Sequence, residues 1–370
     1  MRVFKVLFFV VLVQLVSCNT KDKSQLQPTA KEIDNKQTNF KYWSWMTVGH
    51  KKSDSAYSAH FNKLKSNGFD AVLLNTGADP GLLKRLTPLA KKSGLEVHAW
   101  MFTTNRPGDT VALKHPEWYM VSRSGKSCFN KDERPYVGYY QWLSPSHPDA
   151  RKHILSLVEG LAKVEGVASV HLDYIRYPDV YLPIGLLPKY NLKQEEELPD
   201  YDFDYSDASV EKFIALHHKD PREMENPAID IEWKNFRLNE IKSLVNEAYS
   251  VVHKHNKKLS AAVFPYPEMA DHMVRQRWDK WNVDIVLPMI YYNFYNEELD
   301  WIGYATKQGV EDLEGKPTEL HTGLFTPKLT PNDLKLAIQL AKDNGAKGVA
   351  FFDDYAMTDE QFKVIKNSKK

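Results

Sequence analysis

HLDYIRYP, at residues 171–178, is the most informative stretch of this chain. It places an aspartate, two tyrosines and an arginine where an apolar strand meets a loop. The preceding residues 166–170 are a short β-branched run that follows helix-spaced apolar residues between Ile154 and Val164. Alternation along a strand puts Asp173 on the polar face and Tyr174 on the opposite, apolar face. We therefore expect Asp173 to face an active-site mouth and Tyr174 to point away from it. The alternative is a structural Asp173 that caps the next element or pairs with Arg176.

Strand-like runs of this kind recur along the chain and alternate with runs of helical period, which predicts an α/β fold built of βα units. The expected strands are Lys41–Val48, Ala71–Thr76, Glu96–Phe102, Val167–Tyr174, Lys258–Phe264, Asp284–Tyr291, Glu319–Phe325 and Gly348–Asp353. The expected helices include Asp54–Asn67, Gly81–Ser93, His147–Lys163, Trp233–Asn256 and Pro331–Asn344. Eight strands indicate a (β/α)8 TIM barrel that spans residues 39–370.

Two long loop insertions follow strands three and four, at Thr103–Ser146 and Asp179–Ile231. Both leave the carboxyl ends of strands, which is the face that carries active sites in this architecture. The second insertion contains the acidic run Glu195–Asp204, which we expect to be a solvated surface.

The amino terminus has the pattern of an export signal. Arg2 and Lys5 precede an apolar run that is too short for a stable membrane span, and Leu-Val-Ser then leads into Cys18. The four residues Leu-Val-Ser-Cys, at positions 15–18, resemble the lipobox of bacterial lipoproteins, whose cysteine is lipidated. The alternative is an ordinary signal peptide with a chance cysteine. We expect a signal peptide over residues 1–17, a lipidated cysteine and flexible tether over 18–38, and a cell-envelope location at the outer membrane, facing the periplasm or the surface.

Composition favours an uncharged ligand. The 49 basic and 48 acidic residues nearly cancel, so no field of one sign argues for nucleic acid. Nine Trp and nineteen Tyr offer rings that stack on sugars. The HExxH, CxxC, GxxxxGK[ST], GxGxxG and GxSxG motifs are absent from the sequence, so we predict no metal and no cofactor, and we expect a monomer.

Glycosidic cleavage needs two carboxyl groups that flank the scissile bond, about 5 to 5.5 Å apart in retaining enzymes and about 6.5 to 9.5 Å apart in inverting ones. Asp173 is the first candidate, and its partner is either Glu268 after strand five or Asp354 after strand eight. Glu268 has the alternative role of starting a helix. In the Asp353-Asp354 doublet, alternation predicts that Asp354 faces the mouth, as a catalytic or a substrate-orienting group.

Polar and aromatic side chains at the strand ends and in the loops that follow are the candidate substrate-binding residues. They are Trp45, Asn75, His98, Trp100, Trp142, His171, Arg176, Tyr291 and Asn293. The histidines have the alternative role of holding a neighbouring group, and the tryptophans that of core packing.

Four segments together resemble the bacterial glycoside-hydrolase-like family 10. They are VHAWM at 97–101, residues 115–126 with 142–155, GVASVHLDYIRYP at 166–178, and LSAAVF at 259–264 with DIVLPMIYYN at 284–293. The resemblance implies a (β/α)8 barrel, export, and hydrolysis of glycosidic bonds in a polysaccharide or cell-wall glycan.

Carried over by position, the resemblance makes Asp173 the strand-four acid, His98 and Trp100 cleft residues of strand three, and Tyr291 the aromatic residue of strand six. Tyr174 departs from the pattern, because other members have a second acid directly after the first. The sequence therefore predicts a lipid-anchored glycoside hydrolase. The alternatives are a non-catalytic glycan-binding protein on the same scaffold and a barrel enzyme that acts on a non-sugar substrate.

Overall fold

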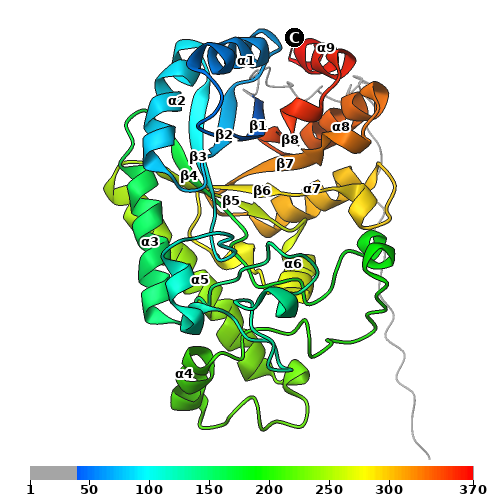
Figure 1. Ribbon diagram of the computed structural model, residues 1–370. Helices are drawn as coiled ribbons and strands as arrows, with labels where there is room; N and C mark the ends of the chain where they lie inside the picture. Colours follow the sequence, from blue (N-terminus) through cyan, green and yellow to red (C-terminus); the bar gives the residue numbers. More distant parts are fainter. Residues whose placement is uncertain (1–39, 370) are drawn as a thin grey trace, which may run out of the picture. The chain divides into compact units, whose positions relative to one another are not determined.

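The computed structural model describes residues 40–369, in which eight parallel strands close into a barrel in chain order, β1 to β8 (Figure 1). The strands are β1 (Lys41–Thr47), β2 (Ala71–Asn75), β3 (Glu96–Phe102), β4 (Ser169–Asp173), β5 (Lys258–Val263), β6 (Ile285–Pro288), β7 (Glu319–Phe325) and β8 (Gly348–Phe352). The predicted (β/α)8 barrel is confirmed. The expected signal peptide, Cys18 and tether lie outside the described residues.

Helices surround the barrel and begin where the sequence carries local start signals. They are α1 (Asp54–Ser66), α2 (Pro80–Lys92), α3 (Pro148–Ala162), α4 (Asp207–His217), α5 (Ile231–Lys254), α6 (Pro267–Val274), α7 (Trp301–Asp312), α8 (Pro331–Asp343) and α9 (Asp359–Ser368). Helices α2, α3, α6 and α8 start with a proline, whose missing N–H is not needed in the first turn. Within residues 40–369, none of the helices combines the length and the hydropathy that a membrane crossing requires.

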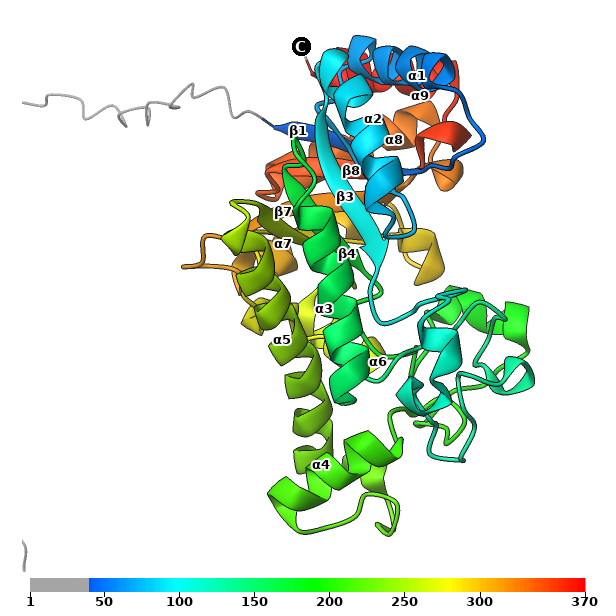
Figure 2. The same cartoon turned by 60° about the vertical axis from the view of Figure 1, so that its left-hand side comes forward.

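The two insertions lie against each other on the carboxyl side of the barrel. The first contains the short 3-10 turns η1 (Ala112–Lys114), η2 (Pro116–Trp118) and η3 (Lys131–Glu133), and the second contains η4 (Ile184–Tyr190), α4 and η5 (Pro227–Ile229). An isolated β-bridge between Ser122 and Phe203 joins them. Helix α4 packs against the amino-terminal part of α5 through Phe213, Trp233 and Phe236 (Figure 2).

The acidic run of the second insertion differs from the expected solvated surface. Asp202 and Asp204 are both fully buried. The Arg237 guanidinium, from α5, donates to Asp202, and the Ser144 hydroxyl, from the first insertion, donates to Asp204. A buried carboxylate is tolerated where partners of this kind meet it, and the sequence of the run alone does not reveal them.

Candidate functional site

The interior of the barrel is filled by aromatic and small polar side chains. The Trp43 ring lies between the imidazoles of His98 and His321, with centroid distances of 4.0 and 4.3 Å. His98 lies 3.1 Å from the Glu96 carboxylate at the amino-terminal end of β3. This layer therefore closes the end of the barrel opposite the insertions.

A chain of hydrogen bonds runs from this layer to the other end of the barrel. His98 Nδ1 lies 2.7 Å from the Ser169 hydroxyl, which lies 3.1 Å from that of Ser260. His171 Nδ1 lies 3.0 Å from Ser260, and the Trp45 indole N–H donates to His171 Nε2 at 3.0 Å. Because an indole N–H can only donate, Nε2 is the acceptor and the His171 proton resides on Nδ1.

Burial lowers the pKa of His171 well below its ordinary value, with a smaller contribution from His98. His171 is therefore a neutral side chain that fixes the orientation of Trp45.

The Trp45 ring also packs closely against Gly323 on β7. A Cβ at Gly323 would lie 3.1 Å from the Trp45 ring and 2.7 Å from Pro288 O, so this position has room only for glycine.

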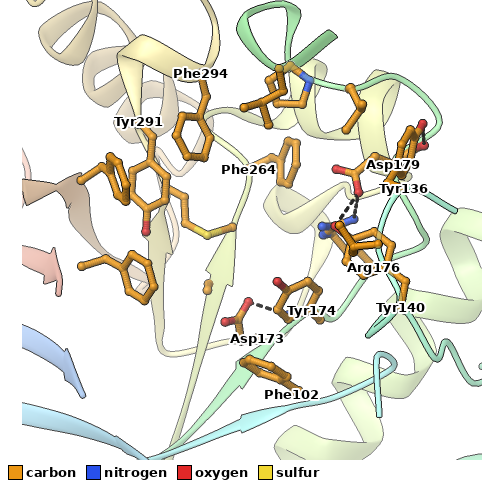
Figure 3. A pocket seen from close by; sticks show the side chains of 18 of the residues that line it. Phe102, Tyr136, Tyr140, Asp173, Tyr174, Arg176, Asp179, Phe264, Tyr291 and Phe294 are labelled. Carbon is orange, nitrogen blue, oxygen red and sulfur yellow. Dashed lines mark hydrogen bonds and ion pairs between the residues drawn. The ribbon is translucent and has the colours of Figure 1, made fainter. Parts of the chain in front are cut away.

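A cavity of about 430 Å³ opens above Trp45, at the carboxyl ends of the strands (Figure 3). Its floor includes Trp100 and Phe102 of β3, Phe352 at the end of β8, and Tyr291, which follows β6. Its walls come from both insertions, which contribute Tyr136, Tyr139, Tyr140, Leu186 and Tyr190. A concave, largely apolar site with a few polar groups is the usual form of a small-ligand or sugar-binding pocket.

Asp173, the last residue of β4, places its carboxyl group in this cavity and is 8% exposed. Its Oδ2 accepts the Trp100 indole N–H at 3.1 Å, and its Oδ1 accepts the Tyr174 backbone N–H at 2.7 Å. Burial raises the pKa of Asp173 from 3.8 to about 6, although both hydrogen bonds and the positive charge of Arg176 act in the opposite direction. A carboxyl group with this pKa carries a proton in mildly acidic solution and can exchange it with a substrate near neutral pH.

Asp179 is the other carboxylate that lines the cavity in the described part of the chain. Its Oδ2 accepts the Tyr140 hydroxyl at 3.0 Å and lies 3.2 Å from Arg176 Nη1. The Arg176 guanidinium lies 4.9 Å from the Trp142 ring and 5.2 Å from the Tyr174 ring. This ion pair is therefore embedded among aromatic side chains and shapes one side of the cavity.

Tyr174 and Tyr291 also line the cavity, and the charge of Asp173 acts on both phenols. Burial raises the pKa of both tyrosines well above the ordinary value. Figure 3 shows the Tyr291 hydroxyl and the Asp173 carboxyl group directed into the same space. Both phenols therefore remain protonated near neutral pH and act as hydrogen-bond donors or acceptors rather than as phenolates.

The structure brings five of the predicted site residues together at the cavity. They are Asp173, Trp45, Trp100, Arg176 and Tyr291. The expectation that Tyr174 points away from the mouth is wrong, because this residue also lines the cavity. Its φ of 51° breaks the alternation of the strand immediately after Asp173.

The two predicted partners of Asp173 lie outside the lining of the cavity. The Glu268 side chain is 58% exposed in the first turn of α6, 3.7 Å from Arg277, which agrees with its alternative role at a helix start. Asp354 is buried elsewhere, where it accepts the Ser44 hydroxyl at 3.0 Å and contacts His60 of α1. Strand β8 ends at Phe352 and the turn η9 (Asp354–Ala356) follows, so alternation no longer predicts the direction of Asp354.

The other predicted binding residues also lie away from the cavity lining. His98 and His171 belong to the barrel interior, and Trp142 is fully buried behind Arg176. The Asn75 side chain accepts the Gly77 N–H at 3.0 Å in the turn after β2, and Asn293 lies in η7 (Tyr292–Phe294). Their predicted contacts with a substrate remain predictions.

Asp179, Tyr140 and the other insertion tyrosines were missed by sequence reasoning. The spacing of Arg176 and Asp179, three residues apart on either side of Pro178, was the available signal for the ion pair. Among residues 40–369, no three His, Cys, Asp or Glu side chains are grouped as metal ligands, so no metal site can be assigned there.

Similar barrels occur in solved glycoside hydrolases. The glycoside hydrolase domain of PgaB (BpsB) from Bordetella bronchiseptica is 14% identical, with a TM-score of 0.63 over 87% of this chain and 95% of that one. The catalytic domain of β-amylase from Paenibacillus polymyxa is 10% identical, with a TM-score of 0.61 over 90% and 98%. A β-galactosidase from Marinomonas ef1 is 11% identical, with a TM-score of 0.63 over 89% of this chain and 59% of that one. At these identities the likeness concerns the fold.

The fold is a closed (β/α)8 barrel of the kind found in these glycoside hydrolases. The chain belongs to the Glycosyl hydrolase-like 10 family, whose model matches residues 7–338. The resemblance seen in the sequence is thereby confirmed. A search of curated proteins found no match.

Proposed function

We propose that the protein is an exported, lipid-anchored glycoside hydrolase that cleaves O-glycosidic bonds in a polysaccharide or cell-wall glycan, with Asp173 as the acid and base. The observation that carries this proposal is the Asp173 carboxyl group, buried at the carboxyl end of β4 in a cavity rich in aromatic side chains, with a pKa raised to about 6. General acid catalysis of glycoside cleavage requires a carboxyl group with a raised pKa. The family and the barrel support a glycan-directed hydrolase.

The test is a screen of the purified domain against peptidoglycan and a panel of polysaccharides, with products identified by mass. Asp173→Asn should reduce turnover by at least ~10²-fold, in the range expected for loss of a general acid. Glu268→Gln is the matched control, because it removes an exposed carboxylate outside the cavity and should leave turnover unchanged. Wild-type turnover in Asp173→Asn would refute the assignment.

A non-catalytic glycan-binding protein is the second candidate. It is favoured by the position of Glu268 and Asp354 outside the cavity and by the engagement of Asp179 with Arg176. A binder would retain glycan without cleaving it, and Asp173→Asn would still bind. Affinity electrophoresis with the same panel separates the two: retention of a glycan with no product after prolonged incubation favours binding.

The proposed anchor rests on Cys18 and the signal-like residues before it. Cys18→Ala should move the protein from the membrane fraction to the soluble fraction of the envelope. Cys128→Ala is the matched control, because Cys128 is the other cysteine of the chain and lies buried in the first insertion. Retention of Cys18→Ala in the membrane fraction would contradict the anchor. A light-scattering mass of the domain equal to one chain would support the expected monomer.

A further inference from the structure

The cavity contains one carboxyl group placed to exchange a proton with a substrate, Asp173. The other carboxylate, Asp179, is 3% exposed, and its Oδ2 is engaged by both Tyr140 and Arg176. In Figure 3 the Tyr174 ring and the Arg176 guanidinium lie between the two carboxyl groups. Hydrolysis by two enzyme carboxylates requires both to face the same glycosidic bond. Asp179 therefore does not have the position of a nucleophile or base that partners Asp173.

The tyrosines near Asp173 do not replace the missing nucleophile. Burial raises the pKa of both Tyr174 and Tyr291 well above the ordinary value of 10, so their phenolates are scarce at the pH where Asp173 holds a proton. A nucleophile must therefore come from the substrate or from water.

We propose, on the basis of the function proposed above, that the substrate supplies the nucleophile. The sugar whose bond is cleaved carries a 2-acetamido group, and the carbonyl oxygen of that group attacks the anomeric carbon. This oxygen must approach from the face opposite the leaving group, so the substrate class is a β-linked 2-acetamido-2-deoxyhexoside, such as a glucosamine or galactosamine derivative. One enzyme carboxyl group then suffices for both steps.

In the first step Asp173 donates its proton to the glycosidic oxygen as the bond from that oxygen to the anomeric carbon breaks. The acetamido oxygen forms a bond to the same carbon and gives a cyclic oxazolinium ion. In the second step the Asp173 carboxylate accepts a proton from water, and the water oxygen attacks the anomeric carbon. The bond to the acetamido oxygen breaks, so one water is consumed, the acetamido group and Asp173 are restored, and the configuration is retained.

The surroundings of Asp173 suit an acetamido group. Ala262, Met289 and Phe352 line the same cavity and offer apolar contacts for its methyl group, whereas ring hydroxyls would need hydrogen-bond partners there. The Tyr291 hydroxyl is directed toward the same space as Asp173, where it can donate to the acetamido carbonyl (Figure 3). Such a bond would hold the oxygen in position for attack.

The test uses glucosamine and galactosamine oligomers with β-1,3, β-1,4 and β-1,6 linkages, each acylated with acetyl, difluoroacetyl or trifluoroacetyl groups. Fluorine withdraws electrons from the carbonyl oxygen and weakens it as a nucleophile. We expect Asp173-dependent cleavage of an acetylated oligomer, with kcat/KM lower by at least about tenfold for the trifluoroacetyl form, or ~1.4 kcal/mol in activation free energy. The first product formed should be the β-anomer, as read by proton NMR.

Several outcomes would overturn the inference. A decrease in kcat/KM of less than tenfold for the trifluoroacetyl form, or an α-anomer as the first product, would show that the acetamido group is not the nucleophile. The same conclusion would follow if incubation with a 2-fluoro sugar substrate trapped an ester on Asp179. Cleavage that depends on Asp173 but is confined to glycans without acetamido groups would overturn the inference and leave the proposed hydrolase intact. Absence of Asp173-dependent cleavage on every acetylated oligomer and every glycan of the panel would overturn both.

Discussion

Replacement of Asp173 by asparagine should make the free energy of unfolding less dependent on pH. The wild type should lose stability as the pH rises, and the variant should lose less. The pKa of Asp173 is raised from 3.8 to about 6 in the folded state because burial disfavours its charged form. A raised carboxyl pKa means that the stability contributed by the protonated form is fully present below pH 3.8 and is lost as the pH rises through about 6. The asparagine variant does not titrate at this position, so it should not lose that contribution.

The magnitude follows from the size of the shift. A change of roughly two pKa units corresponds to ~3 kcal/mol, of which ~2 kcal/mol should be lost between about pH 4.5 and about pH 7.5. The substitution also has a constant effect, because Trp100 and Tyr174 donate to different oxygens of Asp173 and asparagine offers only one. That loss is about 1–3 kcal/mol and does not depend on pH.

Guanidinium unfolding of both proteins at a series of pH values gives the free energy of unfolding as a function of pH. The constant loss from the substitution does not change the slope of that function, so the slopes of the two proteins can be compared directly. Asp359→Asn removes one exposed carboxylate on α9 and controls for the change in net charge. A difference in the free energy of unfolding between wild type and Asp173→Asn that stays constant with pH would refute the raised pKa, and with it the role of Asp173 as an acid.

Three further predictions follow from the same structure. If protonated Asp173 is the acid, kcat/KM on the cleaved glycan should fall about tenfold per pH unit above about pH 6, and a profile that stays flat to pH 8 or so would contradict this. Asp179→Leu leaves Arg176 buried without its carboxylate partner and should lower the free energy of unfolding by ~3–5 kcal/mol. The double variant Arg176→Met/Asp179→Leu removes both charges and should lower the free energy of unfolding by less. Equal decreases in the two variants would contradict a stabilising ion pair. Asp354→Asn should lower the free energy of unfolding by about 1–3 kcal/mol, since Ser44 and His60 contact different oxygens of Asp354 and asparagine keeps only one acceptor, yet it should leave kcat unchanged in the folded enzyme. A large loss of kcat in Asp354→Asn would indicate that Asp354 takes part in catalysis.

The strands could be predicted from the sequence because their signals are local. Period-two apolar runs and turn residues gave all eight, with errors confined to the ends. Strand β4 begins at Ser169 rather than Val167, after Gly166 with a φ of 80°. Strand β6 ends at Pro288 rather than Tyr291, because the backbone turns there: the N–H groups of Ile290 and Tyr291 donate to the carbonyl oxygens of Pro288 and Met289, two residues earlier.

The composition of the site was less accessible to sequence reasoning, since it depends on which distant side chains meet. Sorting polar residues by strand end found Asp173, Trp100 and Tyr291, which the barrel does bring to one cavity. The same rule placed Asp354 in the mouth, but that residue follows the strand and its direction is set by contacts with Ser44 and His60. The insertion tyrosines reach the cavity through loop paths that no periodicity describes.

Tyr174 shows why the alternation rule fails at the point that matters most. Its φ of 51° lies in the left-handed region, which costs a residue with a side chain about 1–2 kcal/mol. The first insertion holds this turn in place, because the backbone N–H of Thr104 donates to Tyr174 O at 3.3 Å and the Thr104 hydroxyl donates to the same oxygen. Strained residues of this kind concentrate at functional sites. The single turn brings the Tyr174 ring to the cavity beside the Asp173 carboxyl group, so one strand end supplies both the acid and an aromatic wall, which strict alternation would have placed on opposite faces.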